Sequence, residues 1–303
     1  MSDRLRLVSY NLLEGLRPIA PIAGERRQLD RERADAARQV VNDLGPDMLV
    51  LNEALYSRQY RGHMVDYARL FGFPYQSAAL YDDAWGNAIL SRCPILRSHE
   101  MSTEDRGGLV AAVDTPIGEL TVASYHPHPS RPPSDKAADF ERLVADLSGP
   151  LIVCGDLNCI SPDDAIDRSA MAAAFRRFAR DPEAAVEQFI ESGRHVFGAL
   201  GKHGLKDAIP LAGRRYSIPT DLISLDKSSG MRIDHILAND GIEVVAGEVV
   251  HSTATNLASD HHPVVLEFVS RRLHHPLTES TQPCASLDGM TATRAVKPRA
   301  ARS

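Results

Sequence analysis

Two uninterrupted apolar runs constrain the fold of this chain more than any other feature. Met48–Leu51 and Leu151–Cys154 each hold four consecutive apolar residues, followed by the polar segments Asn52–Glu53 and Gly155–Asp156. Continuous apolar runs of this length are typical of strands that are buried on both faces. A sheet buried on both faces needs covering layers, so the chain is expected to contain helices that pack against its strands.

Helical periodicity occurs between these strand segments. Apolar residues recur every three or four positions over Glu25–Leu44, and a second helix is expected to begin at Ser134 as its N-cap. Leu5–Asn11 precedes the first helix as a strand, while short strands and turns between positions 88 and 125 indicate an antiparallel meander. The alternation of strands and helices predicts an α/β fold.

Composition excludes several classes of protein. No stretch approaches the roughly 18 apolar residues of a membrane-spanning helix, and charged residues alternate with apolar ones from Ser2 to Arg6, which leaves no room for a signal peptide. The four cysteines show no C-x-x-C spacing, so neither a zinc knuckle nor a redox pair is encoded. These features predict a cytoplasmic protein with reduced thiols.

The C-terminal segment differs from the rest of the chain. Residues 274–303 are rich in Pro, Ser, Thr, Ala and Arg and have no apolar periodicity, so they are expected to form a disordered tail behind one catalytic domain at 1–273. The formal charge of the whole chain is −6, and the tail contributes four basic and two acidic residues, or +2. Residues 1–273 therefore carry −8, which disfavours tight non-specific binding to duplex phosphates.

Polar residues follow most of the expected strands. They form six clusters, at Tyr10–Asn11, Asn52–Glu53, His126, Asp156 with Asn158, Asp234, and Asp260–His261. Taken alone, each cluster is also compatible with a turn or a solvated strand end. Their order along the chain is more informative than any one of them.

The ordered motifs resemble those of the endonuclease/exonuclease/phosphatase superfamily. They are Ser9–Asn11, Leu49–Glu53, Gly86–Arg92, Gly155–Asn158, Arg232–Leu237 and Ser259–Val264. The resemblance covers residues 5 to about 269 and implies a four-layer α/β sandwich, in which two packed mixed sheets are flanked by helices. It also implies metal-dependent hydrolysis of phosphoesters. The sequence departs from many relatives at Asn52, where they carry glutamine.

The resemblance assigns a role to the residues of each motif. Glu53 matches the metal-binding glutamate, Asn11 an asparagine that could hold both metal and phosphate, and Asp260 an additional acidic ligand. Oxygen ligands of this kind suit Mg²⁺, with Mn²⁺ as a substitute. Asp156 matches the aspartate that activates or orients water, and Asn158, expected to face the same way two residues further on, would hold a phosphate oxygen.

Two histidines complete the expected site. His261 matches a histidine that contacts the scissile phosphate, and Asp234 matches the aspartate that would hold its imidazole and raise its pKa. His126 stands where relatives place a histidine or tyrosine near the attacked phosphate. Asn87 is a weaker candidate for phosphate contact, and Asp260 could also serve only to brace its loop.

Some alternatives stay open at this stage. His126 and His128 could form a zinc pair, but Pro127 and Pro129 interrupt the strand that such a pair requires. Arg176 and Arg177 lie between two phenylalanines, an arrangement that occurs more often in a packed helix than in a nucleic-acid groove.

The expected substrate is a small phosphorylated molecule, with DNA or RNA as the alternative. The expectation includes a closed pocket, formed where the stretch between Asn158 and Arg232 folds partly over the site. Arg214 and Arg215 are its candidate phosphate contacts, although a solvated basic turn explains them equally well. The sequence does not predict an oligomeric state.

Overall fold

The computed structural model describes residues 4–20, 28–81, 85–103, 106–223 and 225–270. The chain divides into two units, Met1–Arg272 and Leu273–Ser303. The predicted tail at 274–303 lies outside the described residues, so the elements and contacts below belong to the first unit. No helix in the described ranges is long and apolar enough to cross a membrane.

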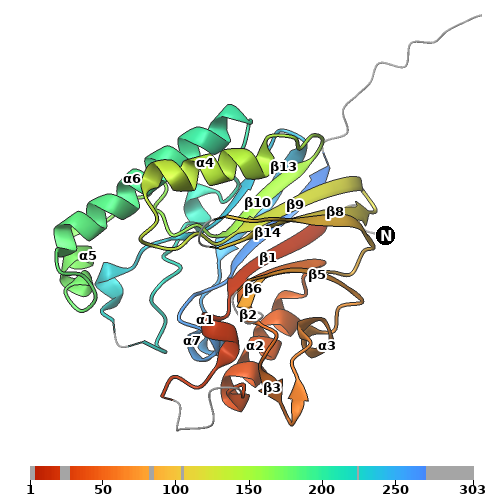
Figure 1. The fold of residues 1–303 in the computed structure, drawn as a ribbon, viewed down its shortest axis with the longest axis horizontal. Coiled ribbons are helices and arrows are strands. Elements are labelled where there is room, and N and C mark those ends of the chain that lie inside the picture. The colour runs from red at the N-terminus through yellow and green to blue at the C-terminus, as the bar shows by residue number, and fades with distance from the viewer. Residues whose placement is uncertain (1–3, 21–27, 82–84, 104–105, 224, 271–303) are drawn as a thin grey trace, which may run out of the picture. The chain divides into compact units, whose positions relative to one another are not determined.

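Two sheets form the centre of the first unit (Figure 1). In the described residues the first sheet has six strands in the order β13-β14-β1-β2-β6-β5, and the second has six in the order β11-β12-β10-β9-β8-β7. The strands of the first sheet are β1 (Leu5–Asn11), β2 (Met48–Leu55), β5 (Tyr75–Tyr81), β6 (Trp85–Ser91), β13 (Ile242–Val249) and β14 (Val264–Ser270). Those of the second are β7 (Ile95–Met101), β8 (Gly108–Thr115), β9 (Gly118–Tyr125), β10 (Leu151–Asp156), β11 (Lys206–Asp207) and β12 (Asp234–Ala238). A separate hairpin pairs β3 (Gln59–Tyr60) with β4 (His63–Met64).

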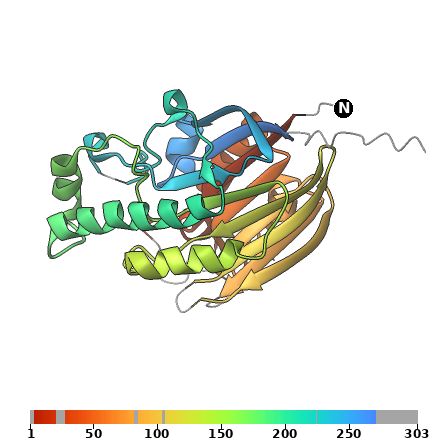
Figure 2. The same ribbon diagram turned by 90° about the horizontal axis from the view of Figure 1, so that it is seen from above.

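Helices cover the outer face of each sheet (Figure 1), and the two long helices over the second sheet lie side by side in Figure 2. A core cluster joins the first sheet to α2 (Arg31–Leu44), α3 (Tyr67–Phe71) and α7 (Thr253–Ala258). Another joins the second sheet to α4 (Pro133–Val144) and α6 (Pro182–Lys202). The remaining helical segments are α1 (Leu13–Leu16), α5 (Arg168–Phe175), η2 (Leu211–Gly213) and η3 (Lys227–Ser229).

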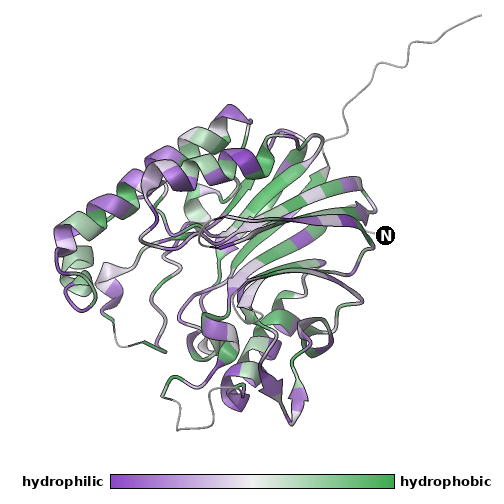
Figure 3. Ribbon diagram, in the orientation of Figure 1, coloured by the Kyte–Doolittle hydropathy of each residue, from purple (hydrophilic) through white to green (hydrophobic). Residues whose placement is uncertain are grey.

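The two sheets pack directly on each other through a shared apolar core. Val50 and Ile89 from the first sheet meet Val122 and Ile152 from the second, and all four side chains are fully buried. Hydrophobic strands enclosed by helices with polar outer faces are visible in Figure 3. The predicted four-layer sandwich of two mixed sheets flanked by helices is confirmed.

Several elements differ in detail from the expectation. Helix α2 was expected over Glu25–Leu44 but begins at Arg31, with the Asp30 side chain as its N-cap. The described residues 28–30 are therefore not helical. Helix α4 begins at Pro133, and Ser134 is not its N-cap. Proline is favoured at the first helical position because its missing N–H would have no helical partner there. The meander between 88 and 125 is divided, since β6 belongs to the first sheet and β7 to β9 to the second.

Much of the stretch between Asn158 and Arg232, which was expected to fold partly over the site, belongs to an outer layer of the fold. Its longest element is α6, whose Val196 and Leu200 pack with α4 against the outer face of the second sheet. A 21-residue helix with one apolar face is stabilised by burying that face on a sheet, so most of the stretch forms the outer layer. That the rest of the stretch closes the site stays a prediction.

Candidate active site

The strand ends that carry the polar clusters meet at one edge of the sandwich. Strands β1 and β2 run parallel with Asn11, the last residue of β1, in register with Asn52, so the clusters Tyr10–Asn11 and Asn52–Glu53 are neighbours. Strand β10 is antiparallel to β12, and Asp156 is directly opposite Asp234 in that pairing. Inter-sheet packing then brings the ends of β1 and β10 within hydrogen-bond distance of each other.

Asn11 is almost fully buried and links two of the carboxylates. Its Nδ2 donates to Asp156 Oδ2 at 3.1 Å and to Glu53 Oε1 at 3.4 Å. The backbone N–H of Leu13 donates to Asn11 Oδ1 at 2.9 Å, which fixes the orientation of the amide. A carbonyl oxygen has two lone pairs, so Oδ1 can still accept a second partner, such as a cation.

Glu53 owes its direction to an irregularity in β2. The register between β2 and β6 shifts between Leu51 and Ala54, and Glu53 has a positive φ of 56°. A non-glycine residue in this region is strained, and such strain is concentrated at functional sites. The carboxylate is held by the N–H of Glu14, which donates to Oε2 at 2.6 Å.

Asp156 lies at the centre of the cluster. Its Oδ2 is 3.2 Å from His126 Nε2 and 3.8 Å from His261 Nε2, and its Oδ1 accepts the backbone N–H of Asn158 at 3.0 Å. Burial by itself would raise the pKa of this carboxyl, but the attraction of His126 and His261 outweighs burial and lowers the pKa below its usual value. Asp156 is therefore ionised over the physiological range, as a base or water-orienting group must be.

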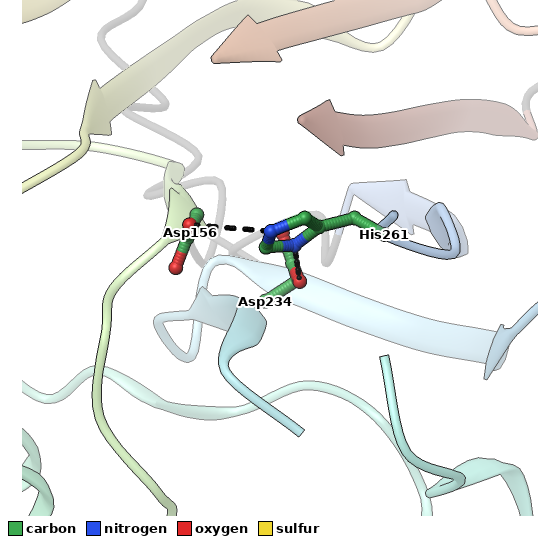
Figure 4. A group of neighbouring side chains, drawn as sticks. All are labelled: Asp156, Asp234 and His261. Atoms are coloured by element: carbon green, nitrogen blue, oxygen red, sulfur yellow. Dashed lines mark hydrogen bonds and ion pairs between the residues drawn. The ribbon is translucent and has the colours of Figure 1, made fainter. Parts of the chain in front are cut away.

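His261 and Asp234 form the predicted dyad (Figure 4). The Nδ1 of His261 is 2.7 Å from Asp234 Oδ2, and both side chains are buried. Burial alone would lower the pKa of His261, but Asp234, Asp260 and Asp156 together raise it well above 6.5. The imidazole is therefore cationic at neutral pH, with Nε2 directed towards Asp156.

Asp260 lies beside the dyad. Its Oδ1 is 3.8 Å from His261 Nε2 and accepts weakly from the Ser259 hydroxyl at 3.4 Å. The pKa of Asp260 is raised, first by burial and also by the negative charge of Glu53, although His261 opposes the increase. Carboxylates that repel one another in a buried site are stabilised when a cation binds between them.

His126 comes directly after β9 and is buried beside Asp156. Its Nε2 is also 3.9 Å from Glu53 Oε1. The ring also contacts the guanidinium of Arg106, whose Nη1 is 2.6 Å from Nε2 and 3.1 Å from Nδ1, and Arg106 in turn stacks on the ring of Trp85 at 4.4 Å. Neither Arg106 nor Trp85 was predicted from the sequence. Their only signal was that Trp85 directly precedes the motif at Gly86–Arg92.

Asn158 is at the site, but not in the expected arrangement. Strand β10 ends at Asp156, and Asn158 adopts a left-handed backbone conformation with φ of 46°, so the two side chains do not share one face of a strand. Its Nδ2 donates to the Pro127 carbonyl at 2.9 Å. The side chain ties the segment after β9 to the segment after β10, and its Oδ1 has no protein donor in the described residues.

Two weaker candidates for phosphate contact are not at the site. Asn87 is fully buried, and its amide bonds to Asn52 and to the Gly107 carbonyl. Arg214 lies between Asp164 and Asp207, with 3.5 Å to each carboxylate. Internal partners use the Asn87 amide, which contradicts the expectation for that residue, while the ion pairs of Arg214 give no support to a phosphate contact.

Arg215 and the basic pair that follows α5 lie on the surface. Arg215, Arg176 and Arg177 are all exposed. Of the neighbouring aromatics, Phe175 packs on Phe189 with 5.5 Å between ring centroids, whereas Phe178 is 73% exposed. The interpretation of this segment as a packed helix holds for Phe175 and fails for Phe178, because α5 ends at Phe175.

The oxygen atoms at the site fit a hard divalent cation better than zinc. In the described ranges one group of His, Cys, Asp and Glu side chains is close enough to share an ion, namely Asp156, Asp234 and His261. Asp234 already accepts from His261 Nδ1, and Asp156 is 3.8 Å from His261 Nε2, so the group is a hydrogen-bonded dyad with a third, ion-paired carboxylate. His128, the second member of the alternative zinc pair, bonds through Nδ1 to Ser130. Glu53, Asp260 and Asn11, the ligands that the resemblance implies, offer oxygen atoms, which are the ligands that Mg²⁺ prefers.

Comparisons with known proteins agree with this geometry. The model of the Endonuclease/Exonuclease/phosphatase family matches residues 8–261. No curated protein matches the chain significantly. Many solved structures match, and three of them illustrate the range.

An endonuclease/exonuclease/phosphatase from Beutenbergia cavernae has a TM-score of 0.61 and 21% identity, with 88% of this chain and 72% of that chain covered. The 3′ phosphatase NExo from Neisseria, bound to a product DNA hairpin, has a TM-score of 0.61 and 19% identity, with 87% and 99% covered. TDP2 from D. rerio, in complex with a single-strand DNA product, has a TM-score of 0.59 and 15% identity, with 89% and 100% covered. These likenesses show a common fold.

The family assignment rests on the extent of the match. The family model covers most of the chain and includes the motifs that carry Asn11, Glu53, Asp156 and His261. The chain belongs to the endonuclease/exonuclease/phosphatase family and is a metal-dependent phosphoester hydrolase.

Proposed function

We propose that this protein hydrolyses phosphoesters with Mg²⁺ at the site formed by Asp156 and His261. One observation carries the proposal. A single carboxylate oxygen, Asp156 Oδ2, is approached by Asn11, His126 and His261, while the other ring nitrogen of His261 is held by Asp234. A buried anionic group and a buried cationic donor thus face each other, and attack of water on a phosphoester requires both.

Glu53, Asp260 and the Asn11 amide oxygen would hold the cation. The raised pKa of Asp260, caused by burial and by Glu53, supports this assignment, because uncompensated carboxylates favour a bound cation. When bound, Mg²⁺ or Mn²⁺ would neutralise charge on the phosphoryl and leaving oxygens. Glu53 is the principal ligand in this proposal, since its carboxylate is held in place by the Glu14 N–H.

The protein groups supply the proton transfer and the orientation. Asp156, ionised because its pKa is low, orients the attacking water and accepts its proton. The His261 imidazolium donates from Nε2 to a phosphoryl oxygen, with Asp234 fixing the ring through Nδ1. His126, beside Asp156, would contact the same phosphoryl group, and Asn158 holds the segment that carries His126 by donating to the Pro127 carbonyl.

We infer that the substrate is a small phosphorylated molecule. The charge of −8 on residues 1–273 would repel a polyanion at long range. Arg106 is the basic side chain found beside His126, and Arg33, which is buried, donates to backbone carbonyls, including those of Leu12 and Ala258. A single phosphate group could be bound by this site without a basic stripe along the surface.

A nuclease is the second candidate, and one observation favours it. NExo and TDP2, which share this fold, are bound to product DNA in their solved structures. Trp85, next to the site, also offers an aromatic surface of the kind on which bases stack. The cytoplasm is the proposed compartment in either case, since Cys93, Cys154 and Cys159 are free thiols.

The test compares substrates at fixed Mg²⁺. Purified protein is assayed with p-nitrophenyl phosphate, bis(p-nitrophenyl) phosphate, nucleotides, and single- and double-stranded oligonucleotides, each at low and moderate salt. The proposal expects turnover of small esters with weak dependence on salt. Efficient DNA cleavage that falls steeply as salt increases would establish the nuclease alternative.

A further inference from the structure

A directional chain of hydrogen bonds runs beneath the candidate site. The backbone N–H of Asp156 donates to Asn52 Oδ1 at 2.8 Å. Asn52 Nδ2 donates to Asn87 Oδ1 at 2.8 Å and to the Ser124 hydroxyl at 3.3 Å. Asn87 Nδ2 donates to the Gly107 carbonyl at 2.7 Å. Both asparagines are fully buried.

The two ends of this chain fix the orientation of both amides. The Asp156 N–H can only donate, so the nearby atom of Asn52 must be its oxygen. The Asn52 nitrogen therefore faces Asn87, which must present its oxygen there and its nitrogen to Gly107. The Gly107 carbonyl can only accept, and this agrees with the orientation set from the other end. Reversing either amide would place two donors or two acceptors against each other in a buried position.

The chain of hydrogen bonds connects parts of the molecule that only the fold brings together. Asn52 and Asn87 belong to β2 and β6 of the first sheet, whereas Asp156 and Ser124 belong to β10 and β9 of the second. Gly155 makes the connection possible, because a Cβ at this position would lie only 2.9 Å from Asn52 Oδ1. The far end, Gly107, adjoins Arg106, which contacts His126.

We propose that Asn52 and Asn87 are positioning residues, which set Asp156 and the Arg106–Gly107 segment relative to each other across the two sheets. This inference rests on the proposed function, because it matters for turnover only if Asp156 and His126 act on the substrate. Neither asparagine touches the candidate reacting atoms. A buried group that orients an active residue usually affects rate by about 10- to 100-fold when it is removed, as outer partners of metal ligands do.

Asn87→Asp tests the chain of hydrogen bonds with the smallest change in shape. The carboxylate of this variant can still accept from Asn52, but its second oxygen would face the Gly107 carbonyl oxygen and break the last link. At pH 8 we expect kcat on bis(p-nitrophenyl) phosphate to fall at least about 10-fold, with KM within about twofold of wild type. When the new carboxyl group is protonated its O–H can donate to Gly107, so the ratio of variant to wild-type kcat should rise as the pH is lowered to 5.5.

Asn87→Ser and Asn239→Asp are the matched controls. The serine in Asn87→Ser does not titrate between pH 5.5 and 8, so the ratio of its kcat to wild-type kcat should be low and should not change with pH. Asn87→Ser also replaces Asn87→Asp if that variant does not fold. Asn239 accepts the N–H of Leu151, the first residue of β10, and donates to the Gly149 carbonyl. It thus holds one end of β10 through a backbone N–H, as Asn52 holds the other end through the N–H of Asp156. Asn239→Asp should keep wild-type kcat.

The outcomes separate this inference from the proposed function. Wild-type kcat in both variants of Asn87, or an Asn87→Asp ratio that does not change with pH, would overturn the positioning role. An equal loss of kcat in Asn239→Asp would show a general effect of lost stability and would overturn it too. Full activity of Asp156→Asn would instead refute the proposed function.

Discussion

His261 is hydrogen-bonded through Nδ1 to Asp234 at 2.7 Å and directs Nε2 towards Asp156, 3.8 Å away. Asp156 and Asp234 are paired on the neighbouring strands β10 and β12. The His261 ring therefore contacts two carboxylates whose positions are set by the pairing of these strands. The short contact orients the ring, while the 3.8 Å to Asp156 is too long for a direct hydrogen bond. The Nε2 of His261 can therefore donate to a phosphoryl oxygen in the proposed reaction.

The stability of the metal-free protein should depend on the charge of His261. Its folded pKa is raised well above 6.5, so below pH 6.5 the histidine is protonated in both states and its contribution is fully present. As pH rises above 6.5, the unfolded state releases its proton first, and the contribution falls by up to about 1.4 kcal/mol per pH unit until the folded pKa is passed.

The measurement is the free energy of unfolding of wild type and His261→Gln, by urea in the presence of EDTA, from pH 6 to 9. The advantage of wild type over the variant should decrease as pH rises. An advantage that is constant or increases over this range would contradict the assigned charge state.

Metal removal should abolish hydrolysis. EDTA should stop turnover of bis(p-nitrophenyl) phosphate, and Mg²⁺ or Mn²⁺ should restore it, because the proposed ligands are oxygens. Glu53→Gln should raise the Mg²⁺ concentration needed for half-maximal rate by at least about 10-fold, with partial recovery at excess Mg²⁺. Exposed Glu243→Gln serves as the control and should leave the Mg²⁺ dependence unchanged. Activity that survives exhaustive chelation would exclude this assignment.

Arg214 should matter for stability and not for substrate binding. It lies with Arg232 between Asp164 and Asp207, and the Arg232 side chain is 3% exposed. Arg214→Gln should therefore lower the free energy of unfolding by about 1–3 kcal/mol, with KM and kcat unchanged. The exposed neighbour variant Arg215→Gln should change neither quantity. A rise in KM for Arg214→Gln without loss of stability would restore its role as a phosphate contact.

Truncation after Leu273 should leave the enzyme intact. Residues 274–303 lack an apolar face that could pack on the catalytic domain, so their removal should change the melting temperature by less than about 2 °C. Turnover should also be unchanged. A large fall in melting temperature, measured by calorimetry on both forms, would show that the segment packs.

Much of the fold was predictable because strand patterns are local. Met48–Leu51 and Leu151–Cys154 are apolar without interruption, and both form central strands, β2 and β10. Polar residues at or near the C-terminal ends of β1 and β2 lie side by side because these strands are parallel, and the same holds for β9 and β10 in the second sheet. That these residues form one site was predicted from the resemblance of the ordered motifs to the family.

The features that sequence could not predict depend on distant partners or on local backbone geometry. Nothing near Arg214 in the sequence indicates Asp164 as its partner. Asn87 resembles an exposed phosphate contact until Asn52 and Gly107 are seen on either side of it. Asn158 follows the end of β10 and has a left-handed backbone conformation. The alternation of side chains along a strand, from which its direction was predicted, does not apply there.

The central claim is that Asp156 and His261 carry out metal-dependent phosphoester hydrolysis. The most direct test measures kcat of wild type, Asp156→Asn and His261→Ala on bis(p-nitrophenyl) phosphate with saturating Mg²⁺, after circular dichroism has shown that all three are folded. Each variant should lose at least about 10²-fold in kcat, because each removes a group that acts on the reacting water or phosphate. Turnover close to wild type in either folded variant would contradict the claim.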